Sequence, residues 1–141
     1  MINSWIIFAL LSALFAALVA MFGKIGISGV DSTLATAIRS IVMAALLVMV
    51  AMASGKFELV GSVDRKALTF IILSGLAGAA SWLFYFWALK NGPATGVATV
   101  DRLSVVFVFI LAALFLGEGF SWKTLLGVGL VVAGSVLVVI K

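Results

Sequence analysis

The feature of this sequence that most constrains its fold is a series of five apolar stretches, each long enough to cross a membrane as a helix. About 20 helical residues span the roughly 30 Å of bilayer hydrocarbon. Because lipid offers the backbone no hydrogen-bond partner, such stretches cross it as helices. We predict an all-α, polytopic membrane protein with a single membrane domain over residues 1–141. The expected spans are residues 4–22, 34–53, 67–89, 94–116 and 122–140.

The composition agrees with a membrane protein and excludes several kinds of chemistry. Of the 141 residues, 65% are hydrophobic and 10% are charged, and there is no His and no Cys. Without imidazole or thiolate, the usual nucleophilic sites and zinc or iron–sulfur sites are excluded. We therefore expect no enzyme activity, no metal and no cofactor. The net charge of +4 comes from scattered residues rather than a basic run, so we expect no nucleic-acid partner.

The first span is expected to remain part of the mature protein. No basic residue precedes Trp5, and no clear small-residue cleavage site follows the apolar run, so the pattern of a signal peptide is absent. We predict that this segment is a membrane helix.

Basic residues are spread almost evenly over the two faces of the membrane. In a chain with five spans the first and third connections share one side, and the second and fourth share the other. Because an excess of Lys and Arg in short loops fixes orientation, near balance allows the chain to insert both ways. The two sets are Lys24, Arg39, Lys90, Arg102 and Lys141 against Lys56, Arg65, Lys66 and Lys123.

An acid and a base stand side by side in the apolar run ATVDRLSVVF at residues 98–107. If the fourth span began after Arg102, residues 103–116 would cover only about 21 Å, which is too short. We therefore predict a helix that begins near Ala94, with Asp101 and Arg102 about two turns inside. The alternative is a span displaced toward Trp122, with both charges at the headgroups. The two side chains point about 100° apart, so they face different partners.

Arg39 lies about a turn and a half into the second span, which enters the membrane from the same side. An ionised residue at the bilayer centre costs roughly 2.5–3.5 kcal/mol, and such residues usually face the bundle interior or a wet cavity. Asp101 is the carboxylate expected at a matching depth, so we predict that it pairs with Arg39. The alternatives are snorkelling of Arg39 to the headgroups and an ion pair that only locks two helices together.

Polar side chains of the third span form one stripe along a helix face, because Ser74, Gly78, Ser81 and Tyr85 follow helical spacing. Trp82, beside this stripe, either lines a cavity or packs in the core. In the fourth connection, Glu118 is interpreted as a hydrogen-bond acceptor at a helix corner or as a gate. The candidate residues for substrate binding or coupling are Arg39, Ser81, Trp82, Tyr85, Asp101 and Arg102.

Most of the chain is similar to a known family, and the likeness is strongest from about Trp82 onward. The stretches FYFWALKNGPATGVATV and VVFVFILAALFLGEGFSWKTLLGVGLVVAGSVLVVI resemble the repeat unit of EamA-type carriers of the drug/metabolite transporter superfamily, with LGE at residues 116–118 and AG at residues 133–134. The resemblance implies a carrier fold of five helices. Members commonly contain two such repeats in inverted orientation, whereas this chain has one. We therefore expect two copies to form an antiparallel homodimer.

The resemblance and the buried charges together predict a small secondary-active transporter. We expect a proton-coupled exporter or antiporter of small metabolites that works by alternating access, because the sequence has no P-loop for ATP. Asp101 is the expected proton-coupling residue, and the excess of arginine favours an anionic or zwitterionic substrate. The alternatives are a flippase subunit for a lipid-linked substrate and a non-transporting accessory or scaffold protein. The expected location is a prokaryotic cytoplasmic membrane, with lipid, substrate, protons and a second copy as partners.

Overall fold

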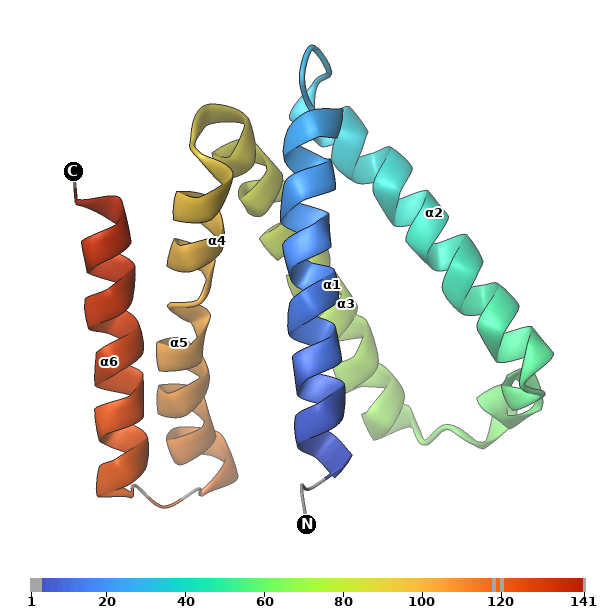
Figure 1. The fold of residues 1–141 in the computed structure, drawn as a ribbon. Helices are drawn as coiled ribbons and strands as arrows, with labels where there is room; N and C mark the ends of the chain where they lie inside the picture. Colours follow the sequence, from blue (N-terminus) through green and yellow to red (C-terminus); the bar gives the residue numbers. More distant parts are fainter. Residues whose placement is uncertain (1–3, 118, 120, 141) are drawn as a thin grey trace. The chain divides into compact units, whose positions relative to one another are not determined.

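The computed structural model describes residues 4–117, 119 and 121–140. Five helical stretches in these residues are long and apolar enough to cross a membrane, which confirms the predicted all-α, five-span architecture (Figure 1). The observed ends differ from the predicted ones by at most four residues, at Gly26 instead of residue 22. The spans are Ser4–Gly26, Ser32–Ala53, Arg65–Asn91, Ala94–Leu116 and Trp122–Val139.

The chain divides into two compact units, which we describe separately. The α2–α3 unit comprises Ile25–Lys90. The α4–α6 unit comprises the described residues of Met1–Lys24 and Asn91–Lys141.

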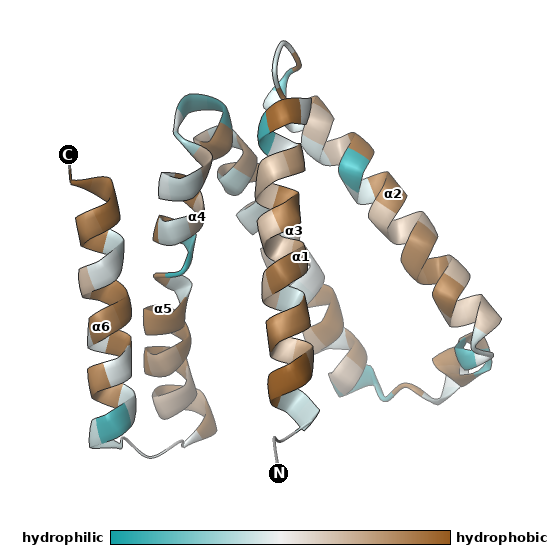
Figure 2. Cartoon of the chain, in the orientation of Figure 1, coloured by the Kyte–Doolittle hydropathy of each residue, from teal (hydrophilic) through white to brown (hydrophobic). Residues whose placement is uncertain are grey.

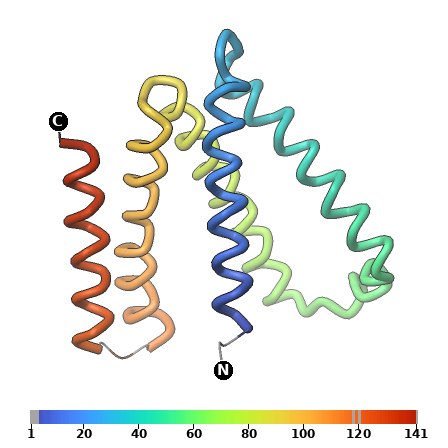
Figure 3. Tube along the Cα trace, in the orientation of Figure 1, coloured from blue at the N-terminus to red at the C-terminus, as the bar shows by residue number. Residues whose placement is uncertain are grey.

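The α2–α3 unit contains two long helices joined by a short 3₁₀ helix. They are α2 (Ser32–Ala53), η1 (Lys56–Ser62) and α3 (Arg65–Asn91). The two long helices approach each other at the start of α2 and the end of α3, where the Lys90 ammonium donates to the Val30 carbonyl at 3.2 Å, and they separate toward η1 (Figures 1 and 3). The buried side chains of the unit gather at the close end, and most of α2 beyond Arg39 is exposed.

The start of α2 is fixed by its N-cap residue, Asp31. One oxygen of this carboxylate accepts hydrogen bonds from the backbone amides of Thr33 and Leu34, at 2.9 and 3.0 Å. These bonds satisfy amides that have no partner within the helix. The Leu34 amide bond is the main reason that the pKa of Asp31 lies below its ordinary value.

The α4–α6 unit contains α1 (Ser4–Gly26), α4 (Ala94–Asp101), α5 (Ser104–Leu111), a π-helical turn η2 (Ala112–Leu116) and α6 (Trp122–Val139). Helix α6 lies alongside α4 and α5 (Figure 1). Near the end of α1, the Lys24 ammonium donates to the Gly92 carbonyl at 2.8 Å. This bond ties the first helix to the turn before α4.

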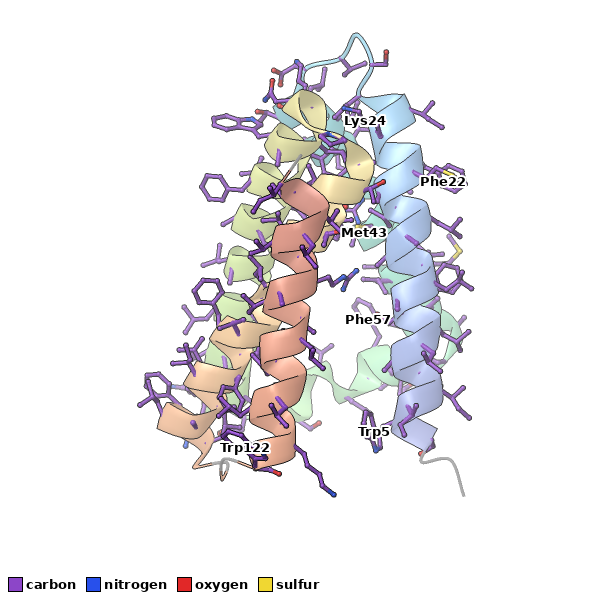
Figure 4. The ribbon with its side chains drawn as sticks, turned by 60° about the vertical axis from the view of Figure 1, so that its left-hand side comes forward. Trp5, Phe22, Lys24, Met43, Phe57 and Trp122 are labelled. Atoms are coloured by element: carbon purple, nitrogen blue, oxygen red, sulfur yellow. The ribbon has the colours of Figure 1, made fainter. Side chains whose placement is uncertain are left out.

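Hydrophobic residues make up most of each helix, and hydrophilic residues lie at the connections and inside two spans, in α2 and at the junction of α4 and α5 (Figure 2). Trp5 and Trp122, at the first turns of α1 and α6, are 65% and 71% exposed (Figure 4). Exposed tryptophans at helix ends are typical of the membrane–water interface. The charged junction therefore stands out as a polar break inside a span.

Candidate functional site

Arg39 lies two helical turns into α2, and its guanidinium stacks on an aromatic ring of α3. Its central carbon is 3.6 Å from the ring centroid of Trp82 and 5.6 Å from that of Phe86. A guanidinium within about 6 Å of an aromatic centroid gains a cation–π attraction, which is larger where water is excluded. The structure thus brings two of the predicted residues, Arg39 and Trp82, into direct contact.

One nitrogen of this guanidinium lacks a hydrogen-bond partner. The Nη1 atom of Arg39 is buried, and it is the only buried side-chain nitrogen or oxygen without a partner in the described part of the chain. The indole of Trp82 is a donor and the ring of Phe86 has no polar atom, so neither offers an oxygen to this nitrogen. The two N–H groups of Nη1 are therefore left without an acceptor among the described residues.

Further aromatic side chains of α3 hold the Trp82 ring in place. The Tyr85 ring meets it edge-on, with centroids 5.4 Å apart and an angle of 73° between the planes. Phe86 is 3% exposed and lies 6.1 Å from the same ring. The predicted residue Tyr85 thus belongs to the cluster. Phe86 was missed, although its position one turn after Trp82 places both rings on the same helix face.

The other polar side chains near this cluster use their own helix as partner. The Thr36 hydroxyl donates to the Ser32 carbonyl at 2.7 Å, and the Ser40 hydroxyl donates to the Thr36 carbonyl at 2.8 Å. Ser81, a predicted site residue, is exposed on α3. Arg39 therefore differs from Thr36 and Ser40, whose hydroxyls have backbone acceptors, because its Nη1 has none.

The fourth span begins at Ala94, as predicted, but it is broken at the charged pair. Helix α4 ends at Asp101, and α5 begins at Ser104. Between them the backbone tightens to 3₁₀ geometry: the Arg102 amide donates to the Thr99 carbonyl at 3.1 Å and the Leu103 amide to the Val100 carbonyl at 2.9 Å. The sequence did not predict this break, because the only proline is Pro93, well before it.

A serine of α6 contacts the backbone at this break. Ser135 is 3% exposed, and its hydroxyl lies within donating distance of the Thr99 carbonyl, at 3.2 Å, and of the Val131 carbonyl in its own helix, at 2.8 Å. In a regular helix the Leu103 amide would donate to the Thr99 carbonyl. Here the Thr99 carbonyl accepts from the Arg102 amide instead, and the Ser135 hydroxyl is a second donor to the same oxygen. Ser135 therefore joins α6 to the irregular backbone.

Asp101 and Arg102 are both exposed, and they lie on different faces of the span. Arg102 borders an open, mainly apolar groove of about 530 Å³ between the fourth span and α6, and Asp101 does not. The groove is lined by Thr99, Arg102, Val105, Leu130, Val131, Gly134, Ser135 and Val138.

Two sequence predictions stay predictions. Arg39 belongs to the α2–α3 unit and Asp101 to the α4–α6 unit, so their pairing is not tested by the geometry within either unit. Glu118, predicted to be a helix corner or a gate, lies outside the described residues. Among the described residues, no three His, Cys, Asp or Glu side chains are grouped closely enough to hold a metal ion.

The comparison with protein families covers almost the whole chain. Residues 3–140 match the EamA-like transporter family. The chain belongs to this family. The resemblance, which is strongest in the second half of the sequence, thus extends over all five spans.

Two relatives are similar to the chain, and one of them is described as a transporter. A Sinorhizobium protein described as an uncharacterized transporter in the cobO 3′ region is 43% identical over 140 residues, which cover 99% of both chains. An uncharacterized protein of Methanocaldococcus jannaschii is 27% identical over 86 residues, which cover 61% of this chain and 63% of its own. No solved structure matches the chain. The first relative therefore has the length of one five-helix repeat.

Proposed function

We propose that this EamA-family membrane protein is a proton-coupled secondary transporter that exports small metabolites by alternating access. The observation that carries the proposal is the broken fourth span, in which an acid and a base stand at a helix interruption about two turns from Ala94. Discontinuous helices in secondary transporters line substrate and ion sites, and ionisable residues inside spans mark transport paths. Membership of the EamA-like family supports transport. The break at Asp101 and Arg102 supports a coupling site in the fourth span.

Asp101 is the proposed proton-coupling residue. It is the acid that lies within a span among the described residues, and it ends α4 at a point where the backbone changes geometry. A proton on this carboxylate removes its charge, which changes the cost of moving the broken segment across a low-dielectric region. Protonation and a shift of the break are therefore proposed to occur together.

The transporter is proposed to work as an antiparallel homodimer in a prokaryotic cytoplasmic membrane. A single five-helix repeat is half of the usual inverted pair, and the Sinorhizobium relative matches over 99% of its length, so it has the same size. Both relatives come from prokaryotes. The near balance of basic residues supports insertion in both orientations.

Transport in proteoliposomes tests the coupling proposal. We expect that an imposed pH gradient drives exchange of a metabolite mixture in the wild type and that Asp101→Asn lowers this exchange at least about 100-fold, while the protein remains folded and dimeric. Asp64→Asn, at an acid before α3, is the matched control and leaves exchange unchanged. Full exchange by the Asp101→Asn protein with a lowered melting temperature would instead assign Asp101 a structural role.

Topology reporters fused after Lys141 test the dimer proposal. We expect equal signals from the two sides of the membrane and cross-links between oppositely oriented copies. A single orientation, or a monomer that exchanges substrate at the wild-type rate, contradicts the antiparallel dimer and leaves the coupling proposal to the proteoliposome assay.

A further inference from the structure

We infer that the Arg39 guanidinium, fixed on the Trp82 ring, binds the carboxylate or phosphate group of an anionic organic substrate. This inference rests on the proposed transport function and names its substrate class. The contacts that carry it lie within the α2–α3 unit, where the guanidinium stacks on Trp82 and Nη1 has no hydrogen-bond partner.

The first argument is a count of hydrogen bonds. A guanidinium has five N–H donors and no acceptor, and two of the donors belong to Nη1. In Arg39 this atom is buried without a partner. A buried donor without a partner destabilises the folded protein, and more so when it carries charge. Such a cost is removed when an oxyanion accepts from the guanidinium, and a planar carboxylate can accept two parallel hydrogen bonds.

The second argument is the direction from which a ligand can bind. The Trp82 ring lies 3.6 Å from the guanidinium carbon and therefore covers one face of its plane. The hydrogen bonds of a guanidinium lie in its plane, so stacking leaves their directions open. Aromatic cover on the face and an unpartnered donor in the plane together favour an anion bound edge-on.

The third argument concerns the rest of the ligand. Trp82, on which the guanidinium stacks, and Tyr85 are both partly exposed, and their rings meet edge-on. Aromatic surfaces of this kind bind apolar or aromatic groups through their area and through edge or offset contacts. A small organic anion with an apolar body thus fits better than a bare inorganic ion.

A matched series of probes tests the charge of the ligand. Benzoate, phenyl phosphate, benzyl alcohol and benzylamine share an aromatic body and differ in their polar group. We expect benzoate or phenyl phosphate to bind the full chain in phosphatidylcholine nanodiscs, measured by titration calorimetry and by the rise in melting temperature. We expect benzyl alcohol and benzylamine to bind at least about 10-fold more weakly.

Variants of Arg39 test the site. Arg39→Gln is expected to weaken binding of the anion by roughly 10- to 100-fold, because a charge-assisted hydrogen bond is lost. Arg39→Lys keeps the charge but loses the planar fork, so we expect a smaller loss that is greater for benzoate than for phenyl phosphate. Arg65→Gln, at the first residue of α3, is the matched control and leaves binding unchanged.

Several outcomes overturn the inference: equal binding of benzylamine, equal binding of the anion by Arg39→Gln, or no binding of either anion. A lipid phosphate is the other source of the same chemistry. If phosphatidylglycerol nanodiscs weaken benzoate binding about 10-fold in the wild type, the site holds a lipid headgroup and the substrate assignment is wrong. Unchanged binding in these nanodiscs supports a soluble anion.

The same variants separate this inference from the proposed function. If proteoliposomes exchange no metabolite but Arg39 still binds benzoate, the transport proposal fails and the anion site stands. If the wild type and Arg39→Gln exchange the same anions at the same rate, the transport proposal stands and the anion site is wrong.

Discussion

Each of the two units contains an arginine about two turns inside a membrane-spanning segment, and the surroundings of the two side chains differ. Arg39 is partly buried against Trp82, with one nitrogen that has no partner. Arg102 is exposed at a helix break and borders an open groove. The same side chain is thus fixed in a regular helix in one unit and placed on irregular backbone in the other.

This difference indicates two separate tasks. A guanidinium that is fixed by an aromatic ring is preorganised for a ligand, because its side-chain entropy is lost during folding and not during binding. A charged pair at a break lies where the backbone has already left regular geometry, so a change of charge there can shift the two half-helices. We therefore associate Arg39 with recognition and the Asp101–Arg102 pair with movement.

The largest expected effect on stability comes from replacing Arg39 with methionine. Arg39→Met removes the unpartnered donors and keeps an unbranched, apolar side chain. We expect it to raise the melting temperature without ligand by up to about 4 °C, since the relief of roughly 1–3 kcal/mol, and more for a charged donor, outweighs a cation–π loss of about 0.5–2 kcal/mol. Thermal unfolding in detergent measures this change.

Arg102→Met is the matched variant in the other unit. Because Arg102 is exposed, its replacement is expected to change stability by less than about 0.5 kcal/mol. The opposite result is that Arg39→Met lowers the melting temperature. That result would show that Arg39 joins α2 and α3 and is not a ligand-binding residue.

The next effect sharpens the role of the aromatic cover. Trp82→Leu removes the ring beneath Arg39, and we expect benzoate to bind roughly 3- to 30-fold more weakly, as the loss of a cation–π contact implies. Trp87→Leu changes the same residue type on the same helix, where Trp87 is 55% exposed and meets Phe84 edge-on. Equal losses for both variants in calorimetry would remove Trp82 from the site. Trp82→Phe keeps an aromatic face and controls for misfolding.

A smaller effect concerns the break in the α4–α6 unit. Ser135→Ala removes the hydroxyl that reaches the Thr99 carbonyl, and we expect a loss of about 1 kcal/mol. Hydrogen exchange of the amides at residues 102–106 is expected to become faster. Ser54→Ala in the α2–α3 unit is the control, since that exposed hydroxyl bonds to the backbone of its own helix. If hydrogen exchange of these amides does not change, Ser135 does not stabilise the backbone at the break.

The smallest effect concerns acid sensitivity at a helix start. The pKa of Asp31 is lowered, so its cap stabilises α2 fully above the ordinary carboxyl value of 3.8, and this stabilisation is lost as the pH falls through the lower folded value. Asp31→Ala is expected to lower the melting temperature slightly at neutral pH and to leave it unchanged in strong acid. Ser121→Ala is the comparison, because Ser121 makes no side-chain cap bond to α6. A difference that persists at low pH would contradict the cap.

Much of the fold followed from the sequence. Apolar run length located all five spans, since the thickness of the hydrocarbon fixes the length of a helix that crosses it. The start of the fourth span at Ala94 followed from the same argument. The aromatic neighbours of Arg39 were in part predictable, because Trp82 and Tyr85 lie on the third span near the expected level of the arginine.

Other features could not be predicted from local pattern. The break after Asp101 contains neither proline nor glycine, and its backbone is joined to Ser135 of α6. Phe86 was not predicted as part of the cluster around Trp82, because the burial of its ring depends on packing and not on its own segment. Each of these depends on which helix lies next to which.

The sequence by itself determined how many helices cross the membrane and where charge enters them, because hydrocarbon thickness and the cost of burying charge act on single segments. Only the tertiary structure decided what each charge meets. A partner such as the Trp82 ring for Arg39, or the Ser135 hydroxyl for the Thr99 carbonyl, comes from a different helix. Contacts across helices depend on packing, which no single segment specifies.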